Sequence, residues 1–375
     1  MQKEVSSGIN KALAAVLIGV MLILMIGIVV NGWQTDSNGE NSGENGNITE
    51  NVDNLNGDTD ENDGTADNFI NSEIVAPKDP EFVSYLTGLE IDEAYQNRIP
   101  FVLVSEPNAP SYGISNSELT IEIPTENGNT RFLNYIINIS NLGKIGAFTS
   151  SRKYITQLTT FFGGLVIANG NDDIISYPSI SSYIAFDLSK HNDVIYKENG
   201  KNLYTDGASI IQIAKDEDID LISYKKPLLP YEFCGFSESV FGKSTAYEIM
   251  IPYSPSNSTS LAYNSVSQSY TLYKNERVKV DMLNGESVEY KNVFVLFSDV
   301  VTYETSYGTE SIVKNETEGT GYYFSNGTLT EIKWSVDSSN NLIFRDLRGN
   351  KLTVNRGNSY IGYYKSCDAD SVTFR

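Results

Sequence analysis

A run of nineteen uncharged, almost wholly apolar residues near the start of the chain limits its fold more than any other feature. Residues 12–30 read ALAAVLIGVMLILMIGIVV. As a helix rising 1.5 Å per residue, such a run extends about 28 Å, close to the thickness of the hydrocarbon core of a bilayer. No small-residue cleavage site or lipid-accepting cysteine follows it, and Trp33 suits a membrane interface. The run predicts an uncleaved, single-pass transmembrane helix over residues 12–33.

The charges that flank this run indicate its orientation. Lys3 and Lys11 precede it, and no Lys or Arg follows it until Lys78. Because positively charged flanks stay in the cytoplasm, residues 1–11 are expected inside the cell and everything after the run outside it. The chain is therefore predicted to be a cell-membrane protein with an extracytoplasmic C-terminal part. Its first expected partner is the cytoplasmic membrane, through residues 12–33.

Residues 34–76 consist mainly of Asn, Gly, Asp, Glu, Ser and Thr. A segment with so few apolar residues buries too little surface to offset the entropy lost on folding, so a disordered acidic linker is predicted. As a flexible coil of about 43 residues it spans roughly 35–40 Å. A calcium-binding loop starting at Asp58 does not fit, because the glycine falls one place late at Gly64 and Phe69 replaces the final Glu.

Net charge and the scarcity of metal-ligand residues exclude several functions. The chain has 48 Asp and Glu against 27 Lys and Arg, a formal net charge of -21, so nucleic acid is not an expected partner. Two cysteines and one histidine cannot build a zinc site, and no metal or cofactor is predicted. Cys234 and Cys367 are interpreted as free thiols, with a disulfide as the open alternative. A Ser–His–Asp hydrolase would have to use His191, the single histidine. The chain has no Gly-x-Ser-x-Gly turn of the kind that holds the serine in α/β-hydrolases, so this function is not expected.

Beyond residue 80 the chain consists of short β-prone runs separated by Gly, Asn and Ser. Several runs alternate apolar and polar residues, as TLTEIKWSV at residues 328–336 does, which indicates sheets with one solvated face. The run NVFVLF at residues 292–297 is apolar after its first residue and predicts a central, buried strand. Strands are predicted at residues 100–104, 119–123, 131–139, 165–168, 246–251, 270–274, 292–301, 329–336 and 359–364.

Few helices are expected. Residues 151–162 carry apolar side chains at helical spacing, begin at a suitable N-cap in Ser150 or Ser151, and end before two glycines. A second, shorter helix is predicted at residues 208–214 behind Asp206 as its cap. Many strands and few helices predict an α+β, β-rich protein built from stacked sheets.

Six segments of the folded region form a series in a fixed order. They are LTGLE at residues 86–90, NRIPFVLV at 97–104, LTIEIPTENGNTRFLNYI at 119–136, GKIGAFTSSRKY at 143–154, GTGYYFSNGTLTEIKW at 319–334 and NRGNSYIGYY at 355–364. In this combination the chain resembles the YerB-like family of bacterial envelope proteins. The resemblance implies two modules outside the membrane, here residues 77–232 and 233–375. It implies a layered sandwich of two sheets plus helices for the first, a mostly antiparallel β structure for the second, and no established activity.

The chain also departs from that family's pattern. Family members are anchored through a lipid-modified cysteine, whereas this chain has the apolar run instead. The chain shares Arg152, Asn202 and Tyr204 with the family, but has Ala109, Thr149, Asn169 and Lys201 where the family has two Arg and two His in one apparent cluster. The resemblance therefore implies that the ligand differs here or that any family chemistry has been lost.

The start of the longer predicted helix is the first candidate binding site. A helix N-terminus offers unpaired N–H groups and partial positive charge, and Ser150, Ser151 and Arg152 cluster there. The predicted site would hold a phosphate or a carboxylate. Arg131 is expected to join these side chains, and the family resemblance adds Asn169, Asn202 and Tyr204 to the site. The alternative is an ordinary helix start whose Arg152 pairs with Glu122 or Glu126.

Glu122 and Glu126 form the second candidate, as a carboxylate pair for acid and base roles on a glycosidic bond. Nearby Arg131 favours an ion-pair network instead, since a neighbouring cation stabilises the charged form of a carboxyl group. Sequence spacing alone does not give the separation of the two carboxylates.

These features predict a membrane-tethered, extracytoplasmic binding or scaffolding protein of the bacterial cell envelope. Its expected ligand is a cell-wall component, another anionic envelope component or an envelope protein. Two alternatives remain open: an envelope hydrolase that uses Glu122 and Glu126, and a purely structural surface protein. Whether the chain is an enzyme stays open, with binding favoured. The chain has 24 tyrosines. Exposed tyrosines could bind sugars or peptides, whereas the others are expected in strands, which tyrosine favours.

Overall fold

We describe the chain from a computed structural model, which covers residues 79–375 apart from 171–183, 224, 306–307 and 315–317. The described residues belong to one compact unit, Val75–Arg375. The predicted transmembrane helix and acidic linker lie outside the described residues. Among the residues that are described, no helix is both long enough and apolar enough to cross a bilayer.

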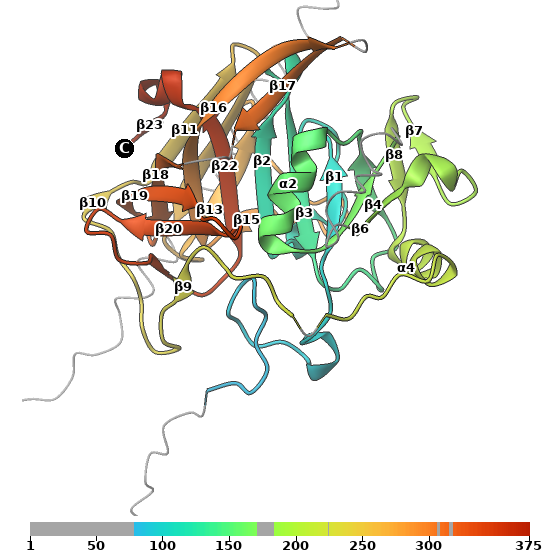
Figure 1. Cartoon of the computed structure of the whole chain (residues 1–375), viewed down its shortest axis with the longest axis horizontal. Coiled ribbons are helices and arrows are strands. Elements are labelled where there is room, and N and C mark those ends of the chain that lie inside the picture. Colours follow the sequence, from blue (N-terminus) through green and yellow to red (C-terminus); the bar gives the residue numbers. More distant parts are fainter. Residues whose placement is uncertain (1–78, 171–183, 224, 306–307, 315–317) are drawn as a thin grey trace, which may run out of the picture. The chain divides into compact units, whose positions relative to one another are not determined.

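The fold is β-rich, with few helices and more than one sheet. The largest sheet runs across the molecule in Figure 1. Its order is β10 (Ser244–Thr245), β19 (Thr328–Val336), β18 (Glu318–Ser325), β16 (Asn292–Thr305), β22 (Ser359–Lys365), β2 (Leu119–Pro124), β3 (Thr130–Ile136), β1 (Phe101–Ser105), β4 (Ile145–Phe148), β8 (Asn202–Thr205) and β7 (Tyr196–Glu198). Four more strands pair beside this path: β17 (Gly308–Lys314), β20 (Leu342–Asp346), β5 (Leu165–Ala168) and β6 (Ile184–Asp187).

A second, smaller sheet packs against one face of the first, on strands from both the N-terminal and the C-terminal segment. Its order is β14 (Arg277–Val278), β13 (Ser269–Lys274), β12 (Asn257–Asn264), β11 (Glu248–Ser254) and β23 (Thr373–Phe374), with β15 (Glu289–Tyr290) also on β13. β9 (Glu232–Phe233) and β21 (Thr353–Val354) form a separate two-stranded sheet. Short 3₁₀ turns are η1 (Glu93–Tyr95), η2 (Ile114–Asn116), η3 (Glu126–Gly128), η4 (Leu188–Lys190) and η5 (Ser366–Ser371).

The N-terminal and C-terminal segments share the large sheet. β22 of the C-terminal segment pairs in parallel with β2 of the N-terminal one, from Leu119–Ser359 to Glu122–Gly362. On its other side β22 pairs with β16, again in parallel. The boundary drawn between residues 232 and 233 therefore divides the chain but not the sheet, and side chains from both segments meet on its faces.

The run NVFVLF lies where its composition predicts. β16 has β18 on one side and β22 on the other, and Val293, Phe294 and Leu296 have no exposed surface. A strand that is hydrogen-bonded on both sides and covered on both faces needs apolar residues at successive positions. The prediction of a central, buried strand is confirmed.

The two predicted helices are present as α2 (Lys153–Phe162) and α4 (Gly207–Asp216). In α4 the Asp206 carboxylate accepts a hydrogen bond from the Ser209 N–H at 2.8 Å, so the predicted cap is confirmed. As the N-cap, Asp206 satisfies one of the backbone N–H groups that the start of a helix leaves unpaired.

The predicted N-cap of α2 is wrong, and its predicted end is confirmed. The N-cap position is Arg152, which makes no capping hydrogen bond, and the chain is still extended there (φ -136°, ψ 151°). Ser150 and Ser151 therefore precede the helix and cannot place their hydroxyl groups over its first turn. At the other end Gly163 leaves the helix with a φ of 71°, which suits glycine, and the predicted terminator is confirmed.

The large sheet is covered by different elements on its two faces. Figure 1 shows α2 lying across β2, β3 and β1. On this face Ile155, Leu158 and Phe162 pack with Val104, Ile121 and Leu133. On the opposite face Phe132, Val295 and Tyr360 pack with Ile251, Leu261 and Leu272 of the second sheet. Farther along, Ile210 and Ile213 of α4 pack with Leu103, Ile145 and Leu165.

Candidate functional site

A buried carboxylate lies between the two packed sheets. Glu122 of β2 has no exposed surface, while its strand neighbours Ile121 and Ile123 join the core on the α2 side. Because side chains alternate along a strand, Glu122 points the other way, toward the second sheet. Its partner in β22 is Gly362, where a Cβ would meet Ile251 Cδ1 at 3.1 Å. The glycine therefore lets the second sheet approach closely at this point.

Four side chains donate hydrogen bonds to this carboxylate. Oε1 accepts from Thr130 Oγ1 at 2.6 Å and from Lys274 Nζ at 2.7 Å. Oε2 accepts from Thr259 Oγ1 at 2.7 Å and from the Tyr360 hydroxyl at 2.6 Å. A carboxylate offers about four acceptor sites, so Glu122 is satisfied without solvent. Two of the donors belong to the large sheet and two to the second sheet, so the network joins the sheets.

The phenols beside Glu122 are held protonated. Burial raises the pKa of Tyr360 well above its usual range, and the negative charge of Glu122 raises it further. Burial and then the same carboxylate also raise the pKa of Tyr253. Both groups therefore stay neutral hydroxyls, and Tyr360 acts as a hydrogen-bond donor.

A second buried cation lies near this network. Lys279 is 7% exposed, and its Nζ donates to the carbonyl oxygens of Pro107 at 2.6 Å and Ala109 at 2.7 Å. Burial and, after it, the charge of Lys274 lower the pKa of Lys279 to about 8. Lys279 is thus still mainly protonated at neutral pH, and two ammonium groups share a region with little water.

These two lysines border a pocket of about 690 Å³, which we call the basic pocket. Residues 107–111, which follow β1, form one wall, and the β13–β14 hairpin forms the other. Three cationic side chains line it, Lys274, Arg277 and Lys279, and no lining residue is acidic. Arg277 is exposed, and among the described residues no ion pair or hydrogen bond neutralises its side chain. The pocket can therefore receive an anionic group.

At the start of α2, the cation that would bind a ligand is already paired with a carboxylate of the chain itself. The Arg152 guanidinium pairs with the Glu126 carboxylate and donates to Ser150 Oγ at 2.9 Å and to the Ser151 carbonyl at 2.8 Å. Burial alone would raise the pKa of Glu126, but hydrogen bonds from Arg152 and from its own backbone, with the charges of Arg152 and Arg131, outweigh it and lower the pKa. The ordinary ion pair, the alternative interpretation of this helix start, is the arrangement observed.

Two further predicted residues lie near this ion pair. Arg131 pairs with Glu106 at 3.0 Å, rather than with Glu122. The backbone N–H of Asn169 donates to the Thr149 carbonyl at 3.0 Å, which places Asn169 just before the helix start. The structure therefore brings Arg131, Asn169 and the helix start into one region, with their charges paired internally.

Asn202 and Tyr204, both in β8, belong to a different group of side chains. The Tyr204 ring packs edge-on against Tyr112 with ring centroids 5.4 Å apart, and Lys144 Nζ lies 4.4 Å from the Tyr204 centroid. The Tyr204 hydroxyl donates to the Pro110 carbonyl at 3.0 Å. This aromatic group therefore encloses a cation that the chain supplies itself.

The carboxylate pair is not arranged for glycosidic-bond hydrolysis. Glu122 has no exposed surface and pairs with Lys274, whereas Glu126 pairs with Arg152. A general acid or a nucleophile must reach the scissile bond, and Glu122 has no path to one in this structure. The geometry favours the ion-pair interpretation of both residues.

The cysteines and the acidic residues add no further chemistry that we can assign. Cys234 is buried and Cys367 is exposed, and each is a free thiol, as interpreted from the sequence. Within the described part of the chain, no group of three or more His, Cys, Asp or Glu side chains has the arrangement of a metal site. The basic pocket and the network beside it are therefore the strongest functional features.

The sequence patterns did not point to the basic side of this site. Lys274, Arg277 and Lys279 fall within six residues of a chain in which acidic residues dominate, and this local excess of positive charge was the signal to follow. Thr259 and Tyr360 carry no such signal, because ordinary strand residues reach Glu122 only through the packing of two sheets.

Together the fold and the site define a class of protein: two β-rich sequence segments share one sheet, with a buried charged network and a basic pocket where they meet. The family comparisons agree. The model for the N-terminal domain of the proteins of unknown function DUF3048 matches residues 86–220, and that for the DUF3048 C-terminal domain matches residues 249–361. The chain belongs to the DUF3048 family, and its resemblance to the YerB-like family is confirmed.

Among solved structures, the YerB protein from Bacillus subtilis is similar to this chain. The TM-score is 0.67 at 18% sequence identity, and the match covers 79% of this chain and 100% of that chain. A comparison with curated proteins finds no match. At this identity the likeness concerns the fold alone, so the function has to be argued from the chain's own side chains.

Proposed function

We propose that this chain is a membrane-tethered, extracytoplasmic binding protein of the bacterial cell envelope, and that its ligand is an anionic envelope component. The apolar residues 12–33 support the membrane anchor, and the acidic residues 34–76 support a flexible tether. Lys3 and Lys11 before the anchor support an outward-facing C-terminal part. An anionic ligand follows from the basic pocket.

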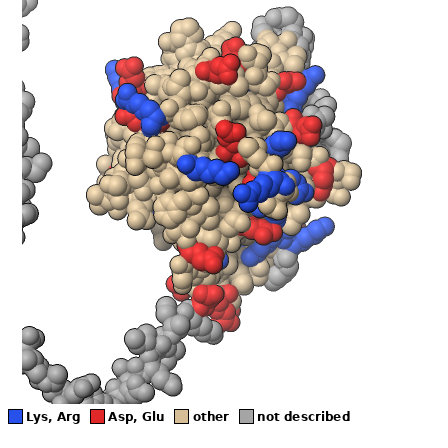
Figure 2. Space-filling view, turned by 90° about the vertical axis from the view of Figure 1, so that its left-hand side faces the viewer, with Lys and Arg blue, Asp and Glu red and all other residues tan. Residues whose placement is uncertain are grey.

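The single observation that carries the proposal is the composition of this pocket. On the side of the molecule shown in Figure 2, acidic and basic side chains are interspersed and much of the surface carries neither. The basic pocket instead has three cationic lining residues and no acidic one, in a chain of net charge -21. Like charges that line one pocket repel one another: the pKa of Lys279 is lowered by burial and then by the charge of Lys274. An anionic ligand relieves that repulsion.

The three cations are not equivalent. Lys274 is neutralised by Glu122, and Lys279 is bonded to two backbone carbonyl groups. Arg277 is the exposed cation that can meet a ligand directly. A guanidinium binds a carboxylate or phosphate through two parallel hydrogen bonds, and the Lys279 ammonium, which has no carboxylate partner among the described residues, adds positive potential.

Calorimetric titration of the full-length protein in mild detergent with pyrophosphate and with citrate tests the proposal. Arg277→Ala should weaken the binding of at least one of these probes about tenfold, which corresponds to roughly 1.4 kcal/mol. Arg348→Ala removes an exposed arginine outside the pocket and should leave binding unchanged. A loss with Arg152→Ala alone would move the site to the helix start, and wild-type affinity in Arg277→Ala would reject the pocket.

A further inference from the structure

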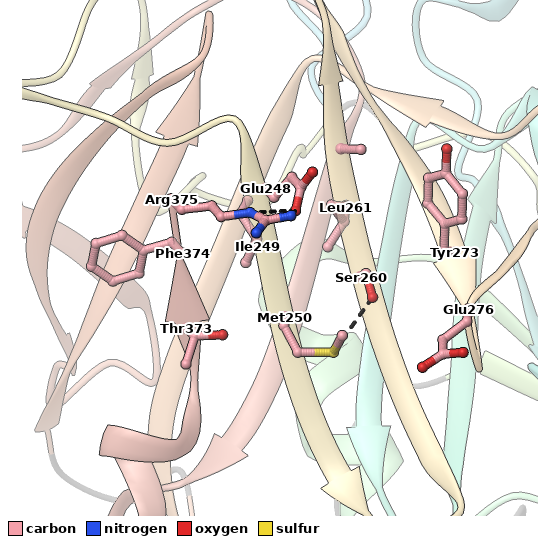
Figure 3. Close-up of a pocket in the computed structure, with 11 residues that line it drawn as sticks. Glu248, Ile249, Met250, Ser260, Leu261, Tyr273, Glu276, Thr373, Phe374 and Arg375 are labelled. Atoms are coloured by element: carbon pink, nitrogen blue, oxygen red, sulfur yellow. Dashed lines mark hydrogen bonds and ion pairs between the residues drawn. The ribbon is translucent and has the colours of Figure 1, made fainter.

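A second pocket, of about 550 Å³, lies on the open face of the smaller sheet. Figure 3 shows its lining side chains, most of which come from β11, β12, β13 and β23, with Glu276 from the turn after β13 and Arg375 after β23. Ile249 and Leu261 point into the core, whereas their neighbours Met250 and Ser260 lie in the pocket. Strand alternation therefore gives this face a floor of small and flexible side chains.

Two aromatic side chains border this pocket. Tyr273 and Phe374 lie at opposite sides of it, with Met250 between them (Figure 3). Phe374 is 37% exposed, and its ring packs edge-on against Tyr322 with centroids 5.2 Å apart. Tyr273 is half-buried. Aromatic rings that are partly open to solvent offer apolar stacking surface, and the Phe374 ring is held by Tyr322.

The charges around the pocket are unbalanced toward the negative. Glu248 pairs with Arg375 at 2.5 Å, so these two charges compensate each other. Glu276 is exposed in the turn after β13, where Asn275 and Glu276 both have positive φ angles of 49° and 64°. Within the described residues no ion pair or hydrogen bond neutralises Glu276. One uncompensated carboxylate therefore stands at the edge of the pocket.

We propose that this pocket binds a glycan strand that carries free amino groups. Sugar rings present apolar C–H faces, which stack on aromatic rings such as Tyr273 and Phe374. An ammonium group on the sugar complements Glu276, as a charge-assisted hydrogen bond requires. An acidic glycan would be repelled by the uncompensated carboxylate of Glu276, and a neutral glycan would gain no charge-assisted hydrogen bond from it.

This site is distinct from the basic pocket. Tyr273 and Lys274 are neighbours on β13, so their side chains point to opposite faces of the strand, and no described residue lines both pockets. Lys274 and Arg277 face the basic pocket, whereas Tyr273 lines the glycan pocket. The proposal therefore does not depend on an anionic ligand.

Two sugar probes that differ in charge test it. The full-length protein in detergent is titrated with the β-1,4-linked glucosamine tetramer and with its fully N-acetylated counterpart. The amino form should bind about five- to tenfold more tightly. Glu276→Gln should reduce that affinity to the level of the acetylated form, Tyr273→Ala should weaken both forms, and Tyr273→Phe should retain them.

Matched variants separate this site from the general attraction of a cationic sugar to an acidic protein. Glu93→Gln removes an exposed carboxylate elsewhere, and Tyr196→Ala removes an exposed tyrosine on β7, so both should bind as the wild type does. Equal affinity for the two tetramers, an equal loss in Glu93→Gln, or full binding by Tyr273→Ala would overturn the proposal.

Discussion

Glu122 and Glu126 are four residues apart in the same β2–β3 hairpin, yet their environments are opposite. Glu122 lies on the strand, has no exposed surface, and pairs with Lys274 of the other sheet, whose side chain is 4% exposed. Glu126 lies in the turn and pairs with Arg152, with side-chain exposures of 14% and 18%. A position facing the second sheet makes a carboxylate part of the sheet-to-sheet packing, whereas a position in the turn leaves it at the surface edge.

The energetics of the two pairs should differ accordingly. Transfer of two charges out of water costs several kcal/mol per ion, and their attraction offsets this only when all remaining hydrogen-bond sites are also satisfied. Around Glu122 the hydroxyl groups of Thr130, Thr259 and Tyr360 complete that set. A partly exposed pair loses less water and gains less, typically about 0–1 kcal/mol.

Removal of Lys274 should therefore have the largest effect. Lys274→Met leaves Glu122 buried without its cation, and the free energy of unfolding should fall by about 3–5 kcal/mol. Urea denaturation of a fragment of residues 77–375, followed by circular dichroism at neutral pH, measures this change.

The matched control is the double variant Glu122→Gln/Lys274→Met. It removes both charges and should recover most of the stability lost by Lys274→Met, since a neutral pair of similar volume needs no ion partner. If the free energy of unfolding of Lys274→Met lies within about 1 kcal/mol of the wild-type value, the Glu122–Lys274 pair behaves like a surface pair, and the proposed difference between the two ion pairs is wrong.

A third carboxylate sharpens the comparison, because it is largely buried without a cation. Burial raises the pKa of Glu118 from 4.5 to about 7, although a hydrogen bond from Ser84 partly opposes the shift. The folded state therefore binds this proton more tightly than the unfolded state does. Its contribution to stability is fully present below about pH 4.5 and is lost as the pH rises toward 7.

Glu118→Gln should remove this pH dependence. Over the full interval the effect is roughly 3 kcal/mol at most, since one pKa unit corresponds to about 1.4 kcal/mol. The variant should thus be more stable than the wild type at pH 8 and close to it at pH 5, in urea denaturation at both values. Equal stability differences at the two pH values would show that Glu118 does not titrate in this range.

Local features of the sequence predicted much of the fold. Apolar composition identified β16 as central, and Asp206 correctly marked the start of α4, because both depend on neighbouring residues only. The pairing of β2 with β22 depends on residues more than two hundred positions apart, and no local pattern specifies it. The six-segment series identified the family, which composition could not do.

The candidate site divides in the same way. The sequence left two partners open for Arg152, Glu122 or Glu126, and the structure shows the pair with Glu126, which lies 26 positions away in the turn after β2. Alternation in β2 indicates that Glu122 faces away from Ile121 and Ile123, but not what it meets there. Its partner Lys274 is 152 positions away, so the expected pairing with nearby Arg131 was wrong. Only the packing of the second sheet supplies that cation.

The smallest effect is expected at the helix start. Glu126→Gln removes the carboxylate but leaves Arg152 within reach of water and of Ser150, so the free energy of unfolding should fall by about 1 kcal/mol or less. Because the pKa of Glu126 is lowered in the folded state, this contribution is present above the ordinary value of 4.5 and disappears as the pH falls through the lowered one.

Urea denaturation of Glu126→Gln at pH 7 and at pH 3 checks both the size and the direction of this effect. The difference from the wild type should shrink at the lower pH, and added salt should shrink it at pH 7, since a partly exposed pair is screened by ions. Lys274→Met, measured in parallel, should respond little to salt because its pair is dry. If Glu126→Gln instead destabilises the fragment as much as Lys274→Met, the turn pair is as important to the packing as the buried one, and exposure is not what separates them.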